Sequence, residues 1–355
     1  METPVVKLPR KRSRTRQIVG GALAVAVVAG VFVFVLPRIA DYRDVWDVVE
    51  TLSWQQLLAL AGATLLNLAT YAPASMAALP GLRLRQAFVV TQASTASTYI
   101  APGGAAPGMA VSYAMMRGWG FKGRAVTLAV TVIGVWNQLA IFGFPVVALA
   151  LLAIVGERNP LLETVALIGL GVVVVGVGIF AAGLSSQRLA SQVGELAARM
   201  VSRLKTLIRR DPVTWGGESL VRFRRETIGL LRRRWHVLTA AILAGQLTVF
   251  LVLLVALRVL DVPSSDVSGI EVFASWSIIR VLGSLPITPG GLGIVELGLT
   301  SLLVSFGGGQ PEVVAAVLVY RFLTIVPTLI LGLAAGVTWK RHHPGALSAA
   351  DSAVD

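Results

Sequence analysis

The feature that most constrains this chain is a series of long stretches without any charged side chain. They cover residues 18–36, 57–82, 86–116, 125–156, 164–187 and 237–257. Each is close to or above the ~20 residues that a helix needs to cross a hydrocarbon core ~30 Å thick. The composition agrees, since 55% of the residues are hydrophobic and only 14% are charged. The sequence therefore predicts an all-α polytopic membrane protein.

The net charge of +13 lies in a few segments rather than over the whole chain. Residues 1–17 carry six Lys/Arg, and residues 184–235 carry twelve against four acids. Cytoplasmic loops of membrane proteins are enriched in this way, and such segments contact anionic lipid. The distribution predicts a multi-pass protein of the cell membrane with cytoplasmic N- and C-termini, and it argues against a nucleic-acid partner.

Several chemistries are excluded by residue usage. The chain has no cysteine, which rules out disulfides, thiolate catalysis and Cys-ligated metals. Its three histidines include His342 and His343 in a basic tail (residues 339–355), so we predict neither a metal nor a cofactor. The first apolar run has no small-residue cleavage site after it and is interpreted as a retained anchor.

The charge pattern predicts about six full spans. They are expected near residues 18–36, 57–78, 125–154, 161–184, 237–260 and 311–338. Ser53 and Ser268 each begin a capping box that opens a helix, and Pro311 opens the last span. Residues 185–235 are interpreted as a basic amphipathic segment lying on anionic lipid.

Two further apolar segments are broken by proline and glycine. They read "YIAPGGAAPGMA" around Pro102 and "LPITPGGLGIVELG" around Pro289. In the first, each arm has only about 12 to 15 residues, too short for a comfortable crossing. Re-entrant hairpins fit this pattern. The alternative is that the broken segments cross the membrane as short full spans, so that eight helices are counted as spans.

The two broken segments occupy matching places in the chain. Residues 57–155 and 236–338 each read as a span, a Pro-Gly-Gly hairpin and a proline-bearing span, entered from opposite sides. This is the pattern of an inverted-topology repeat, which transporters build around a site near the bilayer midplane. Chance similarity between Gly/Ala/Val-rich segments is the alternative.

The second broken segment holds the strongest candidate site residues. Pro289, Gly290, Gly291 and Gly293 would free backbone amides for an anionic ligand, or would allow a tight helix crossing. Three charged residues lie within the apolar stretches of this unit, namely Arg280, Glu296 and Arg321. Because charge within a membrane is costly, they are expected to form a buried pair, a substrate or ion site, or both in turn.

The candidate site residues of the first unit are all uncharged. Pro102, Gly103 and Gly104 form its break, and Asn137 and Gln138 lie in the span that follows. Hydroxyl side chains precede the break, but Ser and Thr in membrane helices commonly bond their own backbone. The three residues of the break and the two amides are therefore added to the candidate substrate-binding residues, and the hydroxyl side chains are not.

These segments resemble one family. "SLPITPGGLGIVELGLTSLLV", "VLVYRFLTIVPTLILGL", "YIAPGGAAPGMAVSYAMMRGWGF" and "VTVIGVWNQLAIFGFPVVALALL" look like the lysylphosphatidylglycerol synthase transmembrane-region, or flippase-like, family over about residues 20–340. The Pro-Gly-Gly-x-Gly-x-x-Glu element from Pro289 to Glu296 is the most specific signature. Many members have Pro-x-Arg-x-Gly-Glu in the first hairpin, where this chain has the uncharged "PGGAAPGMA".

The resemblance implies movement of a lipid between leaflets. In such members a soluble C-terminal domain makes the aminoacylated lipid, and since none follows here before Asp355 we expect no synthase. A non-enzymatic translocase of an anionic phospholipid or lipid-linked sugar is the first hypothesis. No Walker-type motif is present to power it. A scaffold for a cell-envelope biosynthesis enzyme and a membrane-embedded transferase are the alternatives.

Overall fold

The computed structural model describes most of the chain after residue 49. The described residues are 50, 52–101, 105–155, 160–185 and 217–339, with isolated positions between 186 and 216. They form helices and connecting turns, and no strand occurs among them. The predicted all-α class is therefore confirmed, while the predicted anchor at 18–36 lies outside the described residues.

The first unit contains five helices. They are α3 (Trp54–Thr70), α4 (Ala72–Ala78), α5 (Leu84–Ile100), α6 (Ala106–Gly118) and α7 (Gly123–Val155). The capping box predicted at Ser53 is present, since the Ser53 amide donates to Gln56 Oε1 at 2.8 Å and the Ser53 hydroxyl accepts from the Gln56 amide. Helix α8 (Pro160–Ser185) then leads towards the second unit.

The second unit begins with one long helix, α10 (Gly217–Val259), whose 43 residues span about 65 Å. The predicted span from about residue 237 is thus its second half, and residues 217–235 continue it without a break. Helix α11 (Gly269–Ser284), the turn η3 (Pro289–Gly291), α12 (Ile294–Ser305) and α13 (Gln310–Thr338) follow. The box predicted at Ser268 and the proline in the first turn of α13 are both confirmed.

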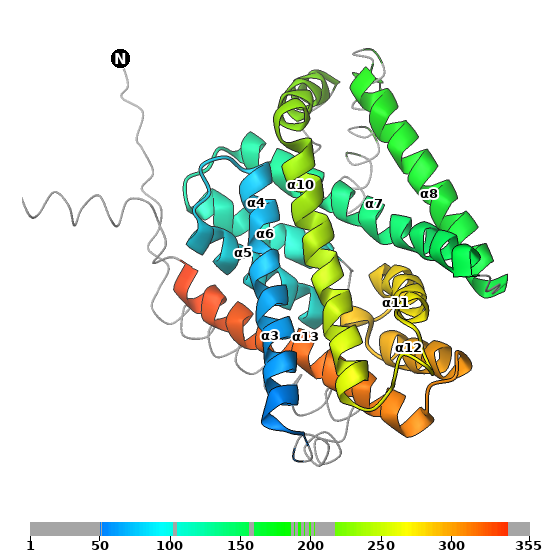
Figure 1. Cartoon of the computed structure of the whole chain (residues 1–355). Coiled ribbons are helices and arrows are strands. Elements are labelled where there is room, and N and C mark those ends of the chain that lie inside the picture. Colours follow the sequence, from blue (N-terminus) through cyan, green and yellow to red (C-terminus); the bar gives the residue numbers. More distant parts are fainter. Residues whose placement is uncertain are drawn as a thin grey trace, which may run out of the picture.

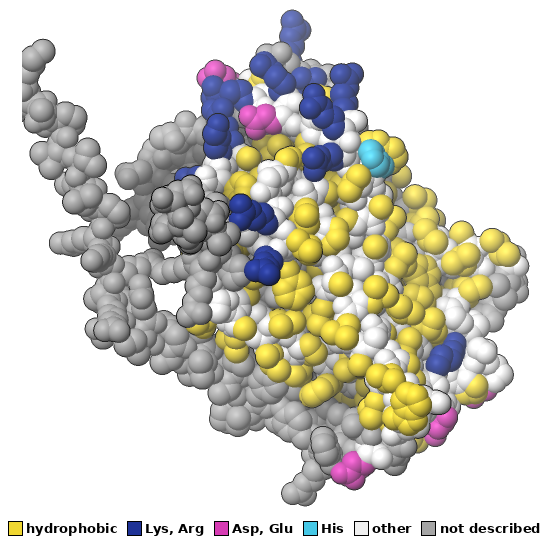
Figure 2. Space-filling view, turned by 60° about the vertical axis from the view of Figure 1, so that its left-hand side comes forward, with side chains coloured by type: hydrophobic (Ala, Val, Ile, Leu, Met, Phe, Trp, Pro, Cys, Tyr) yellow, Lys and Arg dark blue, Asp and Glu magenta, His cyan; other side chains and the backbone are white. Residues whose placement is uncertain are grey.

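Long apolar helices establish the membrane class. Among the described residues, four are long and apolar enough to cross a bilayer: Trp54–Ala78, Gly123–Ile154, Val221–Val259 and Gln310–Thr338. Figure 2 shows most Lys and Arg side chains gathered at one end of the molecule and a largely hydrophobic surface below them. An apolar band bounded by a basic end is the surface expected of a multi-pass membrane protein.

Helices α3 and α10 run side by side in opposite directions through the middle of the fold (Figure 1). Hydrogen bonds tie them together, from Gln56 to the Val259 carbonyl at 3.0 Å and from Asn67 to Thr248 at 3.1 Å. A core of small and aliphatic side chains fills the first unit, mainly from α4 to α7.

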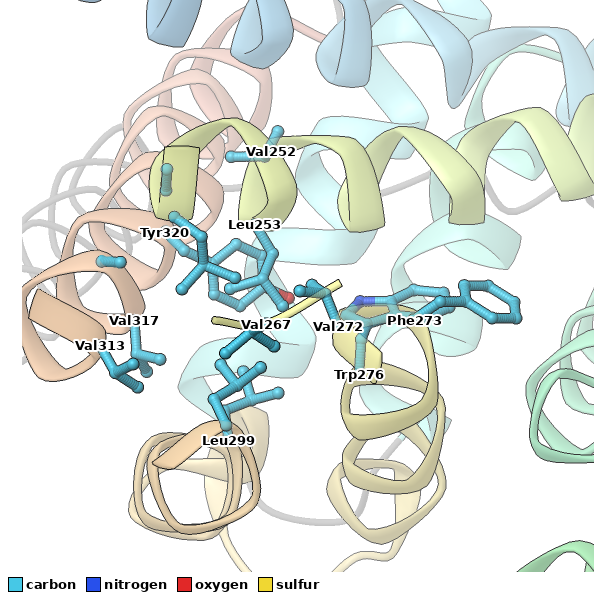
Figure 3. Packing of buried hydrophobic residues seen from close by; sticks show 14 of the residues in the cluster. Val252, Leu253, Val267, Val272, Phe273, Trp276, Leu299, Val313, Val317 and Tyr320 are labelled. Atoms are coloured by element: carbon cyan, nitrogen blue, oxygen red, sulfur yellow. The ribbon is translucent and has the colours of Figure 1, made fainter. Parts of the chain in front are cut away.

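The second unit has its own core, built mainly by α10 to α13. Figure 3 shows Leu253 of α10 pointing towards the side of Val272 of α11, with Leu299 and Tyr320 in the same cluster. Trp276 stacks on Phe273, with ring centroids 5.8 Å apart. The candidate site lies between the two units, where a cavity is lined by residues of both.

Candidate functional site

The chain reverses between α11 and α12 through a segment that requires glycine. Gly290, Gly291 and Gly293 have φ values of +60°, +69° and +81°. Side chains with a Cβ rarely adopt this left-handed region, and three such residues within four positions cannot continue a helix. The sequence prediction of a broken apolar segment therefore holds at this position.

The same glycines allow close packing. A Cβ built on Gly290 would lie 2.5 Å from Tyr99 Cδ1 of α5, and one on Gly291 would lie 3.2 Å from the Gly283 Cα of α11. The tight crossing considered from sequence is therefore present at Gly291. A Cβ built on Gly293 would instead meet no atom within 4 Å. The turn η3 of the second unit also packs on α5 of the first.

A buried ion pair fastens this segment to the last helix. Arg321 Nε of α13 donates to Glu296 Oε1 at 2.5 Å, and Arg321 Nη2 donates to the Gly290 carbonyl at 3.0 Å. The second carboxylate oxygen accepts from the Gly293 amide at 2.6 Å. Of the two pairs considered from sequence, the structure has Glu296–Arg321. The Gly293 amide, expected to be free for an anion, is occupied by the carboxylate.

Arg280 has different partners. Its Nε donates to Gln246 Oε1 of α10 at 3.0 Å, and Gln246 Nε2 donates to Asn137 Oδ1 of α7 at 2.6 Å. The two outer helices of this polar chain, α7 and α11, belong to different units. Within the described part of the chain, no carboxylate lies within ion-pair distance of Arg280. Its positive charge is uncompensated there.

These residues surround a cavity of about 320 Å³. Its wall draws on all five helices of the first unit, α3 to α7, and on α10, α11, α12 and α13 from the second. The volume is at the lower end of the range of small-molecule sites. No Asp, Glu or His is found among the described residues of the wall. The cavity thus has a mainly apolar wall with several polar side chains and a net positive charge, and it lies between the two units.

The predicted site residues divide into three groups. Arg280, Gly290, Arg321, Asn137 and Gln138 line the cavity. Pro289, Gly291, Gly293 and Glu296 are not part of the wall and shape the broken segment behind it. Pro102, Gly103 and Gly104 lie outside the described residues.

Sequence reasoning missed two parts of the wall. Gln246, only 3% exposed, connects Arg280 with Asn137, and its signal was an amide within an otherwise apolar run. The second part is the hydroxyl face of α5. Its members Thr91, Ser94 and Thr98 bond their own backbone, as expected, yet they also line the cavity.

Comparison with models of known protein families gives a match that covers most of the chain. The model of a family described as the lysylphosphatidylglycerol synthase TM region matches residues 21–332. No curated protein matches the chain. The matched range includes every predicted site residue and the whole described cavity wall.

Proposed function

Because the chain belongs to the lysylphosphatidylglycerol synthase TM-region family, we propose that it is a flippase-like translocator. It moves the headgroup of an anionic or zwitterionic lipid, or of a lipid-linked sugar, from one leaflet to the other, and it is not itself an enzyme. The observation that carries this proposal is Arg280, a cation without an acidic partner in the described wall of a cavity between two membrane-embedded units.

The energetics of Arg280 favour a ligand. A charged side chain near the bilayer centre costs roughly 2.5–3.5 kcal/mol even on the most lenient insertion scale. Arg280 donates one hydrogen bond to the neutral Gln246 amide, and such a bond from a charged group contributes about 1.5–3 kcal/mol. This bond offsets part of the cost but leaves the net charge unbalanced. Water or an anionic headgroup in the cavity would stabilise the remaining charge.

The helix packing supports an inverted repeat of residues 57–155 and 236–338. The first hairpin helix α5 packs on the last helix of the second unit, α13, and the corresponding helix α11 packs on the last helix of the first unit, α7. Helices α3 and α10, which open the two units, pack on each other. Reciprocal contacts of this kind support a shared cavity at an interface that would move during alternating access.

The lengths of the hairpin helices support re-entrant hairpins. Helices α5, α6, α11 and α12 have 17, 13, 16 and 12 residues. At 1.5 Å per residue they extend about 18 to 26 Å, less than a hydrocarbon core of ~30 Å. The members of each pair pack on one another, α5 on α6 and α11 on α12. Each hairpin would bring its break towards the middle of the membrane.

Translocation is tested by reconstituting the full chain in vesicles that contain phospholipids with a fluorescent acyl chain. Dithionite added outside quenches the fluorescence of inner-leaflet lipids only after they have moved to the outer leaflet, and the rate of this loss is followed. We expect faster exchange of an anionic lipid than in protein-free vesicles. The Arg280→Gln variant should lower the rate by roughly tenfold, corresponding to about 1.4 kcal/mol in the barrier. Arg124→Gln, an exposed arginine at the start of α7, is the matched control.

The assay is run without a gradient, with a membrane potential and with a pH gradient, because the chain has no recognised ATP motif. Wild-type rates equal to those of empty vesicles under all three conditions would refute translocation. The alternative of an accessory subunit for an envelope-biosynthesis enzyme would then take first place.

A further inference from the structure

The wall of the cavity has an unequal supply of charges. Two arginines line it, but the charge of Arg321 is balanced by Glu296 at 2.5 Å. Arg280 therefore gives the described wall a net charge of about +1, with no described carboxylate to receive a cation. A headgroup with one negative charge would complement this wall, and a headgroup carrying an additional ammonium group would meet repulsion.

Four hydroxyl groups on the wall already donate their protons within their own helices. The Thr91 hydroxyl donates to the Ala87 backbone carbonyl at 2.7 Å. The Ser94 hydroxyl donates to the Thr91 backbone carbonyl at 3.0 Å, and the Thr98 hydroxyl donates to the Thr95 backbone carbonyl at 2.7 Å. Ser284 of α11 does the same towards the Val281 carbonyl at 2.7 Å. A hydroxyl that donates its only proton keeps lone pairs for an incoming donor. The wall thus offers a row of acceptors on α5 and one on α11.

Two groups of the second unit can donate hydrogen bonds into the cavity. Arg280 lines the cavity with a guanidinium of which only Nε has a bond, and the guanidinium group suits the oxygens of a phosphate. The Thr288 hydroxyl, which lines the cavity beside η3, is buried without a hydrogen-bond partner in the described structure. A ligand that bonds all of these groups has one anionic group together with several hydroxyl donors.

We infer that the cavity selects a polyhydroxylated headgroup joined through a single phosphodiester, as in a glycosyl or polyol phospholipid, and excludes a cationic aminoacylated headgroup. Arg280 and Thr288 bind the phosphate oxygens, and the hydroxyl face of α5 accepts from the sugar or polyol. This inference rests on the proposed function for its site, but it concerns recognition, which is measured separately from movement.

Native mass spectrometry of the purified full chain provides the test. The detergent-solubilised protein is offered equal amounts of phosphatidylinositol, phosphatidylmethanol and lysylphosphatidylglycerol. The first two have the same charge and differ in hydroxyl groups, and the third carries a net positive charge. We expect at least fivefold more phosphatidylinositol than phosphatidylmethanol bound, and no enrichment of the lysylated lipid.

Variants identify the cavity as the source of the preference. The double variant Ser94→Ala/Thr98→Val should lower phosphatidylinositol binding to the level of phosphatidylmethanol. Arg280→Gln should lower the binding of both anionic lipids. The control Thr127→Val removes an equivalent hydroxyl, bonded to the Gly123 carbonyl at 2.9 Å but exposed on α7 and outside the cavity wall, and should change nothing.

Equal binding of phosphatidylinositol and phosphatidylmethanol by the wild type, or enrichment of the lysylated lipid, would overturn the inference. Its failure is distinguishable from that of the proposed function. Selective binding without any exchange in vesicles would reject translocation and retain the recognition site. Equal exchange of all anionic lipids, combined with equal binding, would reject the selectivity and retain translocation.

Discussion

At the residue scale, the Glu296–Arg321 ion pair is expected to contribute strongly to the stability of the fold. Both residues are buried, with exposures of 7% and 6%. Removing one partner leaves the other charge buried and unpaired, which typically costs about 3–5 kcal/mol. We therefore expect Glu296→Gln to lower the thermal unfolding midpoint in detergent, and Glu296→Gln/Arg321→Gln to regain part of the loss, because neither charge then remains.

The exposed Glu226 of α10 is the matched control, since Glu226→Gln removes a carboxylate that has no ion pair within the described structure. A Glu296→Gln variant as stable as Glu226→Gln would show that the pair does not hold the broken segment. A double variant less stable than either single variant would assign the coupling to other contacts.

At the scale of elements, the crossing of α5 and α13 depends on one small residue. A Cβ on Gly332 of α13 would overlap the Ala96 side chain and approach the Gln92 carbonyl to 2.8 Å. Gly332→Ala should force the helices apart and destabilise the protein by about 1–3 kcal/mol. Gly336 on the same helix has nothing within 4 Å. Gly336→Ala should instead stabilise by about 0.5–1 kcal/mol.

Thermal unfolding of the two variants beside the wild type checks this prediction. Because both substitutions are identical in chemistry and lie one turn apart, helix propensity cancels between them. Similar midpoints for the two variants would contradict a close crossing between the units.

At the scale of the whole molecule, the basic end is expected to face the cytoplasm. The chain has no cysteine, so single cysteines can be labelled without background. Ser265→Cys follows α10 near acidic residues and should react with an impermeant maleimide from outside intact cells. Lys122→Cys, between α6 and α7, should react only after permeabilisation. The opposite pattern would reverse the orientation.

The same reagent separates re-entrant hairpins from short spans. Ile287 lies between α11 and η3 and is 67% exposed in the isolated chain. In a re-entrant hairpin Ile287→Cys stays within the membrane region and should label slowly after permeabilisation. Labelling as fast as that of Lys122→Cys would mean that α11 and α12 both cross the bilayer.

Many elements of this fold can be predicted from local properties of the sequence. Hydropathy located the four described helices that are long enough to cross a bilayer. The residue pattern at Ser53 and Ser268 located two helix starts, and glycine located the break after Pro289. These features depend only on neighbours in the chain, because a backbone turn or a capping bond involves residues at most a few positions apart. The polar residues of the site were also recognisable, as Arg280 and Glu296 lie within apolar stretches.

Tertiary structure decided what those residues do. Two arginines were available to Glu296, and the rotation and depth of packed helices chose Arg321 and left Arg280 to Gln246. The same packing brings the α5 hydroxyl groups to the cavity wall and leaves Glu296 outside that wall. Sequence spacing cannot supply this, because pairing across 25 or 34 positions depends on how every intervening helix packs. The sequence by itself determined where polar groups enter the apolar stretches, and only the fold decided which of them face the cavity.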